Sequence, residues 1–229
     1  MTRFYSVQDG HHVPLIPPQN ITGGITSPAF AVKNYAHSSI FLNLGAQAAA
    51  CTAILLLAAA NAAGTGPTFT GTTASGSNQV TGVFPFNGIN AAVGQGISGT
   101  GIPGSTTVTA VGAPNSLGLV TVYLSANATA AGTVTLTMAA MPIAYDLFAC
   151  EVANQDTLGP RLAQTAAGYA PSATADIFYV IEYETSQLPP GYDYLALKVA
   201  NGANANYAAA HAVLSGARFG QDQSPSVLV

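Results

Sequence analysis

The strongest strand pattern of the chain lies at Ile177 to Lys198, IFYVIEYETSQLPPGYDYLALK. Its two ends are rich in Ile, Val, Leu, Phe and Tyr, and they predict strands at Ile177–Glu184 and Tyr194–Ala200. Between them, Leu-Pro-Pro-Gly-Tyr at 188–192 predicts a firm turn, because both prolines preset φ and Gly191 supplies a backbone angle that other residues rarely adopt. Two strands joined by such a turn indicate a β-rich chain.

Similar patterns lie on either side of this stretch. Strands are predicted at Ala144–Ala153 and Ala208–Leu214. Further upstream, AFAVKNYAHSSIFLNL at 29–44 breaks into two β-type runs around the polar segment 34–39, which predicts a core hairpin. In the second run, one face carries three apolar residues, Ile40, Leu42 and Leu44.

The alanine-rich segment Gly45–Ala63 has two interpretations. A strand is favoured, but a helix stays open because alanine is the best helix former. Its inner part, AQAAACTAILLLAAANAA at 46–63, is too weakly apolar for a membrane span, since a transmembrane helix needs about 20 strongly apolar residues. We therefore expect no membrane contact.

Charged residues are scarce, and this scarcity limits the classes of partner that the chain is expected to bind. The chain contains no Asp, Glu, Lys or Arg from Asn34 to Tyr145, and only 6% of all residues are charged, against about 25% in an ordinary soluble domain. A surface of hydroxyls, amides and glycine is poorly protected against association, so we expect a homo-oligomer, with a trimer as one form considered. Five basic residues in a chain of net charge −4 argue against nucleic-acid binding.

The segment Gly64–Thr137 differs from the rest and predicts an inserted module. It contains no charged residue and is rich in Gly, Thr, Ser and Ala, and its β-branched residues alternate with turn residues. Short strands at close spacing indicate a small β-sandwich or barrel. The predicted strands are Gln79–Gly82, Thr106–Val111, Val120–Leu124 and Gly132–Thr137.

The predicted fold is thus all-β, a β-sandwich (jelly-roll-like) domain interrupted by a small module. Residues 1–63 and 138–229 form the split domain and residues 64–137 form the module, with Leu55–Ala60 and Ala144–Ala153 expected to pair as neighbours. Residues 1–28 contain four of the fourteen prolines and predict an extended N-terminal arm that reaches a neighbouring subunit.

Cysteine use and the N-terminal sequence indicate the compartment. Cys51 and Cys150 lack the paired spacing of a zinc site and are expected to be buried thiols rather than a disulfide. The first 20 residues contain no apolar segment of the kind that a signal peptide needs, so we expect the chain to be made in a cytoplasm.

The candidate catalytic motifs lack the neighbouring residues that their chemistry requires. The strings Gly94–Gly99 and Gly99–Gly104 match G-x-G-x-x-G, yet a Thr-rich strand and no acid follow them, so they indicate glycine turns rather than a dinucleotide site. Glu182 and Glu184 share one face of a strand, which is typical of a solvated face.

The histidines give no further signal for chemistry. His11 and His12 would diverge on an extended chain, and His37 and His211 stand alone in the sequence. We therefore expect no enzyme activity, no catalytic, cofactor-binding or metal-binding residue, and no cofactor.

Several stretches resemble capsid-associated proteins of tailed bacteriophages. They are AVKNYAHSSIFLNLG at 31–45, the late pair of strands at 177–198, which is similar to a matching hairpin, and AHAVLSGARF at 210–219. The module is similar, through SGTGIPGSTTVTAV at 98–111 and LSANATAAGTVTLT at 124–137, to one found in phage tail, fibre and surface proteins.

This resemblance implies a structural protein of the virion. The expectation is a head decoration or cement protein that is assembled in the bacterial cytoplasm. It would oligomerise on the major capsid protein, or on neighbouring virion proteins, through strand edges, the arm and apolar contacts. The alternative is a tail, collar or fibre component whose module binds a host surface ligand.

Overall fold

The computed structural model describes residues 10–84, 93–153 and 155–217, and the chain is all-β. Within these residues the only helical element is a single 3₁₀ turn, Thr185–Gln187, so no described helix could cross a membrane. Cys51 and Cys150 are both buried and free, as predicted.

The chain divides into two compact units. Unit 1 comprises the described parts of Met1–Leu57, Pro142–Leu188 and Tyr194–Val229, and unit 2 those of Ala58–Met141 and Pro189–Asp193. The boundaries lie a few residues outside the predicted module. The turn Pro189–Asp193, which the prediction placed in the split domain, groups with unit 2.

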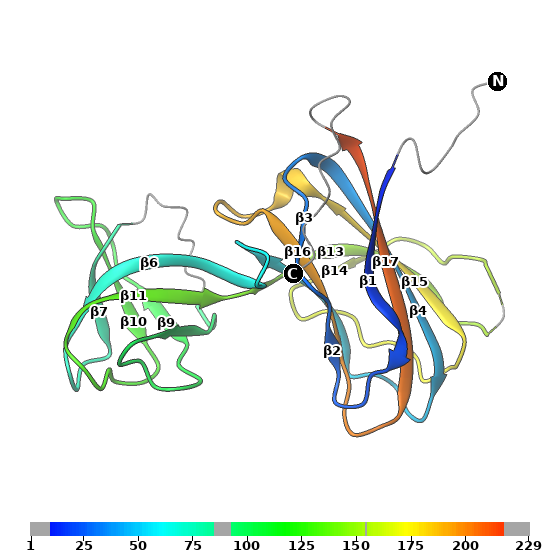
Figure 1. Cartoon of the computed structure of the whole chain (residues 1–229), viewed down its shortest axis with the longest axis horizontal. Helices are drawn as coiled ribbons and strands as arrows, with labels where there is room; N and C mark the ends of the chain where they lie inside the picture. Colours follow the sequence, from blue (N-terminus) through cyan, green and yellow to red (C-terminus); the bar gives the residue numbers. More distant parts are fainter. Residues whose placement is uncertain (1–9, 85–92, 154, 218–229) are drawn as a thin grey trace. The chain divides into compact units, whose positions relative to one another are not determined.

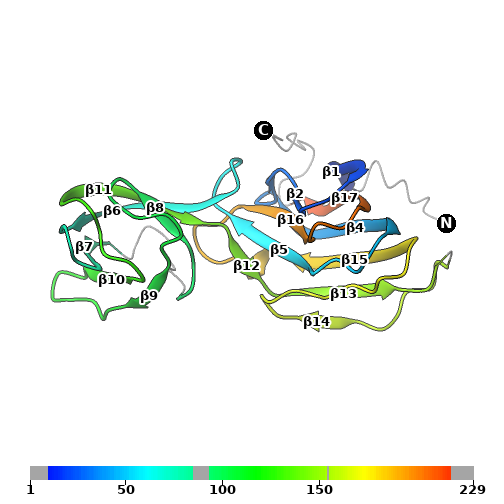
Figure 2. The ribbon, with the colours of Figure 1, turned by 90° about the horizontal axis from the view of Figure 1, so that it is seen from below.

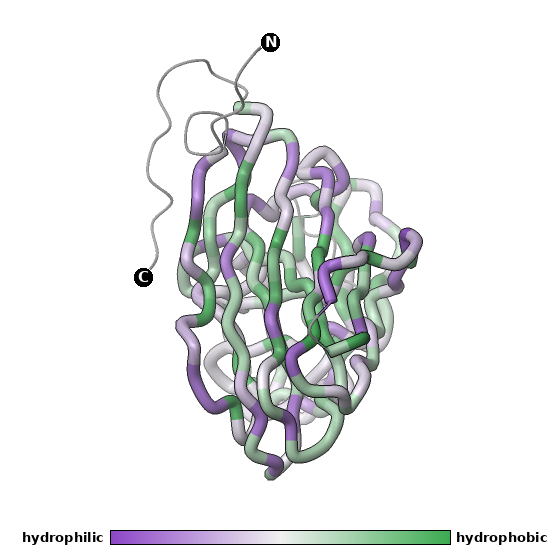
Figure 3. The backbone as a smooth tube through the Cα atoms, turned by 90° about the vertical axis from the view of Figure 1, so that its right-hand side faces the viewer, coloured by the Kyte–Doolittle hydropathy of each residue, from purple (hydrophilic) through white to green (hydrophobic). Residues whose placement is uncertain are grey.

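Unit 1 contains a six-stranded antiparallel sheet in the order β1-β17-β4-β15-β13-β14 (Figures 1 and 2). Its strands are β1 (Gly10–Asn20), β17 (Asn206–Ala217), β4 (Tyr35–Gln47), β15 (Ile177–Glu184), β13 (Tyr145–Cys150) and β14 (Leu162–Gln164). Buried and more exposed residues alternate along β4 and β17, and hydrophobic and hydrophilic segments follow one another along the backbone in Figure 3, which is the pattern of a sheet with one buried face. Ile40, Leu42 and Leu44 are fully buried on β4, which confirms the predicted apolar face.

A second sheet, in the order β12-β5-β16-β2, completes the core of unit 1. Its strands are β12 (Met141–Ile143), β5 (Ala53–Ala59), β16 (Tyr194–Ala200) and β2 (Ile25–Thr26), and β3 (Phe30–Ala31) also pairs with β16. The buried Tyr145 hydroxyl on β13 donates to the Ile54 carbonyl on β5 at 2.6 Å, which links the two sheets. The arrangement is of the β-sandwich type, and β5 settles Gly45–Ala63 in favour of strand.

Three predicted pairings in unit 1 are wrong. The two runs of residues 29–44 form no hairpin, because β3 pairs with β16 while β4 pairs with β15 and β17. Leu55–Ala60 and Ala144–Ala153 do not pair either, since β5 and β13 belong to different sheets. For the same reason β15 and β16 are not a hairpin, and the turn that follows β15 carries the chain between sheets.

The predicted N-terminal arm is also corrected. Residues 10–20 form β1, which pairs with β17 of the same chain, and Val13, Leu15 and Ile16 are buried in the core. Ile25 and Thr26 form β2 against β16. Apolar burial therefore keeps this segment within unit 1, and residues 1–9 lie outside the described part of the chain.

Unit 2 is a six-stranded sheet in the order β8-β11-β6-β7-β10-β9. Its strands are β8 (Ile97–Gly99), β11 (Gly132–Ala139), β6 (Thr65–Thr73), β7 (Gln79–Val83), β10 (Val120–Leu124) and β9 (Val108–Val111). The two outer strands meet, because Gly96 bridges Thr107 and the Ile97 amide donates to the Thr106 carbonyl at 2.9 Å. The sheet thus closes on itself as a small barrel, within the predicted range of sandwich or barrel.

The barrel is filled by apolar side chains of all six strands. Leu136, Val80, Val83 and Val122 are fully buried within this core, with Phe69 beside them. Small residues allow the close approach of strands. A Cβ atom at Gly99 would lie 2.6 Å from Leu136 Cδ2, so Leu136 packs directly on the backbone of β8.

The predicted turn at Leu188–Tyr192 is confirmed. The Tyr192 amide donates to the Pro189 carbonyl at 3.1 Å, and Gly191 has φ +86°, the geometry of a type II turn. Within unit 2, Gln95 Nε2 donates to the buried Tyr192 hydroxyl at 2.8 Å, so this turn packs with the barrel residues.

Candidate interaction surface

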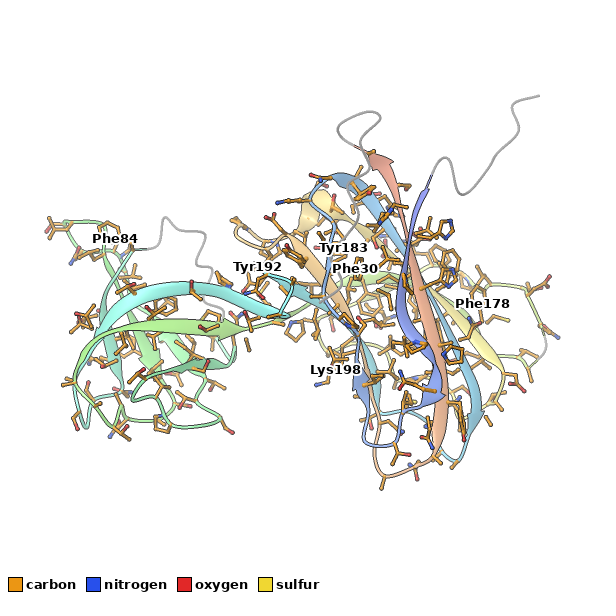
Figure 4. All side chains as sticks on the ribbon, in the orientation of Figure 1. Phe30, Phe84, Phe178, Tyr183, Tyr192 and Lys198 are labelled. Carbon is orange, nitrogen blue, oxygen red and sulfur yellow. The ribbon has the colours of Figure 1, made fainter. Side chains whose placement is uncertain are left out.

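The outer face of the six-stranded sheet of unit 1 carries a row of apolar and aromatic side chains. The strand register places Phe148 opposite Val180, Val180 opposite Phe41, and Phe41 opposite His211. Directly paired residues share a face, so these four lie side by side across β13, β15, β4 and β17. Phe178, labelled on β15 in Figure 4, lies two residues from Val180 and shares this face.

The rings of this face stack on one another. Phe41 stacks with His211 at 5.0 Å between ring centroids and with Phe178 at 6.3 Å, and His211 in turn stacks with His12 at 6.4 Å. Val180 among them is only 5% exposed. We call Phe41, Phe148, Phe178, Val180 and His211 the aromatic band. It is an uncharged apolar surface on the side of the sheet that faces away from the core.

The edges of the same sheet are poorly suited to pairing with another chain. Edge strand β1 contains Pro14, Pro17 and Pro18, which cannot donate a backbone hydrogen bond, and its register with β17 shifts twice. The opposite edge strand, β14, has only three residues. The barrel of unit 2 joins its own edges. A partner would therefore meet a sheet face rather than a sheet edge.

An ionic cluster lies on the outer face at one end of the sheet. His37 on β4 bonds through Nε2 to Glu182 and through Nδ1 to Glu184 Oε1 at 2.9 Å. The Ser39 hydroxyl donates to Glu182 Oε2 at 2.7 Å. These contacts follow from register, because Glu182 is paired with Ser39 and Glu184 with His37. We call His37, Glu182 and Glu184 the histidine clasp.

The contacts of the histidine clasp favour the protonated form of His37. The hydrogen bond to Glu182 is the largest cause that raises the pKa of His37 above its usual value, and the charge of Glu182 and the contacts with Glu184 act in the same direction, against burial. Both ring nitrogens face carboxylates, so the imidazolium form, which donates from both, fits best. Ser39 bonds to a carboxylate and not to the imidazole, so it lacks the base contact of a hydrolase nucleophile.

A cavity of about 190 Å³ lies beside the clasp. Its lining adds Asp146 and Arg161, whose side chains form an ion pair at 2.9 Å. Among the described residues no group of three or more His, Cys, Asp or Glu could hold a metal ion. The cavity is thus a polar hollow whose charges are largely bonded to each other.

A second carboxylate anchors the long connection after β13. Glu151 Oε1 accepts hydrogen bonds from the Tyr179 hydroxyl at 2.6 Å, the Tyr169 hydroxyl at 3.0 Å and the Ser172 amide at 3.0 Å. Burial, then the bond to Glu151, raises the pKa of Tyr169 to about 12. Sequence reasoning did not single out Glu151, because its partners lie 18 to 28 residues away.

The other residues considered in the sequence have structural roles. His11 and His12 contact different partners, Tyr35 and His211, as expected for neighbours on an extended strand. His37 and His211, which appeared isolated, are both in contact networks. The G-x-G-x-x-G strings lie around β8, where Gly94 and Gly101 adopt positive φ, so they are glycine turns of the barrel as predicted. Glu182 and Glu184 share the outer face as predicted, although both are bonded to His37.

Comparisons of the chain with protein-family models, with curated proteins and with solved structures find no match.

Proposed function

We propose that this chain is a virion structural protein, a head decoration or cement protein that forms a homo-oligomer and sits on the major capsid protein. The observation that carries the proposal is the aromatic band, an uncharged face on a sheet whose edges are blunted. Interfaces have aromatic residues enriched and charged residues depleted at their centre. The resemblance of the split domain to phage capsid-associated proteins supports the same function.

The two units resist uncontrolled association in a way that suits such a protein. A closed barrel exposes no strand edge, so unit 2 can do without charged residues and still avoid edge-to-edge pairing. In unit 1 the prolines of β1 have the same effect at an edge. In the six-stranded sheet and in the barrel, faces are thus better suited than edges to an ordered lattice contact, so the proposal uses face contacts in place of the edge and arm contacts expected from the sequence.

The test is co-sedimentation of the purified chain with phage shells that lack it. We expect saturable binding, with a fixed number of copies for each shell protein. A variant with a charge added to the outer face, Asn43→Asp, should bind at least about tenfold more weakly, because the new carboxylate would be buried next to Asp156 and Asp176, which line the same hollow. Absence of saturable binding to such shells would contradict the proposal.

A second candidate function is a tail, collar or fibre role for unit 2. One observation favours it: Phe84, Val111 and Leu117 are 56%, 43% and 74% exposed. Leu117 lies in the connection between β9 and β10, Val111 ends β9, and Phe84 follows Val83, the partner of Val120 at the start of β10. The three therefore lie on or next to the adjoining strands β7, β10 and β9 of the barrel.

The two functions differ in what the full chain binds. If unit 2 recognises a host surface ligand, the full chain should bind host cells, and Leu117→Asp should weaken that binding. The decoration function predicts shell binding that Leu117→Asp leaves unchanged.

A further inference from the structure

We propose that the outer face of the six-stranded sheet is the interface with a second copy of this chain, packed face to face as an isologous dimer. This inference rests on the proposed function, that the chain acts by assembling. It names the surface and the partner, and it replaces the trimer considered from sequence.

The size of the face matches what a stable dimer needs. The strands β1, β17, β4 and β15 each pair over eight or more residues, whereas β13 has six residues and β14 three. At about 4.8 Å between strands and about 3.3 Å per residue, the face measures roughly 650 Å². A standard interface buries about 600–1,000 Å² for each partner. The face is therefore large enough for one copy to cover another, as sheets do in a sandwich.

The distribution of charge has the form of an interface centre and its rim. The aromatic band occupies the middle of the face and contains no carboxylate or ammonium group. The histidine clasp and Asp146 lie toward one end of the strands, and Asp156 and Asp176 line a hollow with Phe178 and Asn43 toward the other. Two copies with their bands in contact would keep these acidic groups at the rim, where water and salt screen them.

A second copy is the occupant that this face fits, because it supplies the same uncharged band. In an isologous contact the same surface of each copy contacts the other copy, so a single patch serves both partners. The shortage of charge in the whole chain adds to this, since a monomer with a partly exposed apolar face and few charges is prone to associate. Acidic rims on both partners mean that salt should strengthen the dimer.

Asn43 offers a clean probe of the face. It lies on the outer face of β4, is exposed, and lines the hollow beside Phe178 as well as one beside Tyr207. Asn43→Asp adds a charge next to Asp156 and Asp176 without removing an apolar contact within the chain. Thr26→Asp on β2 adds the same charge to an exposed strand position of the other sheet, opposite Lys198, and serves as the matched control.

The experiment is sedimentation equilibrium of the full chain over a range of protein concentrations at low and high salt. We expect the wild type and Thr26→Asp to reach twice the 23.0 kDa chain mass, with tighter association at high salt. Asn43→Asp should associate at least about tenfold more weakly, with a circular dichroism spectrum like that of Thr26→Asp.

Two results would overturn the inference: a wild type that is monomeric at all concentrations, or equal association of Asn43→Asp and Thr26→Asp. A monomeric wild type that still binds shells would place the shell protein on this face and overturn the second copy, while the proposed function stands. A wild-type dimer that Asn43→Asp abolishes, together with no binding of the wild type to shells, would uphold the interface and contradict the proposed function.

Discussion

Truncation of a buried leucine in the barrel tests whether each unit has its own core. Leu136 on β11 is fully buried, pairs with Phe69 on β6 and packs on the backbone of Gly99. Leu136→Ala removes three carbons from a site where one wall is backbone and cannot collapse into the space. We therefore expect a loss of about 3–4 kcal/mol in the free energy of unfolding of unit 2, within the range of about 2–5 kcal/mol for buried Leu→Ala changes.

The measurement is hydrogen exchange followed by mass spectrometry. Leu136→Ala should raise the exchange rates of the slowest amides in β6, β10 and β11 by about two orders of magnitude or more, and leave those of β4 and β17 unchanged. Leu147→Ala, at a fully buried position of β13, is the matched control and should give the reverse pattern. Equal loss of protection in both units, from either variant, would refute the reasoning that the two cores are separate.

Three further predictions follow from particular contacts. Because the pKa of His37 is raised in the folded chain, its contribution to stability is full below about pH 6.5 and falls as the pH rises through the folded pKa; His37→Gln should flatten this part of a pH series of urea unfolding curves. Gly168→Ala, where a Cβ would lie 2.4 Å from the Ile54 carbonyl oxygen, should destabilise by at least about 2 kcal/mol, whereas Gly76→Ala, at a similar φ but in open space, should cost only about 1 kcal/mol in calorimetry. Glu151→Ala leaves the Tyr179 hydroxyl without its acceptor and should cost about 2 kcal/mol by urea unfolding; an unchanged midpoint would contradict the anchoring role.

The strands could be predicted because their local pattern is strong. Ile177–Glu184 and Tyr194–Ala200 match β15 and β16 to the residue, and Val120–Leu124 matches β10. Apolar and β-branched residues in short runs bounded by turns carry this signal. The Pro-Pro-Gly turn was equally clear, since its residues dictate the backbone angles.

Pairing between strands could not be predicted, because periodicity does not say which strand lies next to which. The prolines of residues 10–20 indicated a free arm, yet in the structure these residues form an edge strand. Its apolar residues Val13, Leu15 and Ile16, which are buried, were the part of the sequence that indicated a core strand. The polar segment before Ile40 was interpreted as a turn because it contains His37 and Ser39. Both belong to β4.

The histidine clasp shows the same limit. His37 and Ser39 lie two apart on one strand, and Glu182 and Glu184 two apart on another, so each pair alone has the pattern of a solvated face. Only the register of β4 with β15 brings them together. The aromatic band likewise depends on four strands whose order the sequence does not state.

The most direct test of the central claim is quantitative mass spectrometry of purified phage particles that carry this gene. The account predicts that the chain is present in a fixed ratio to the major capsid protein, in many copies for each particle, and that it resists salt washing. Absence of the chain from purified particles would contradict the account.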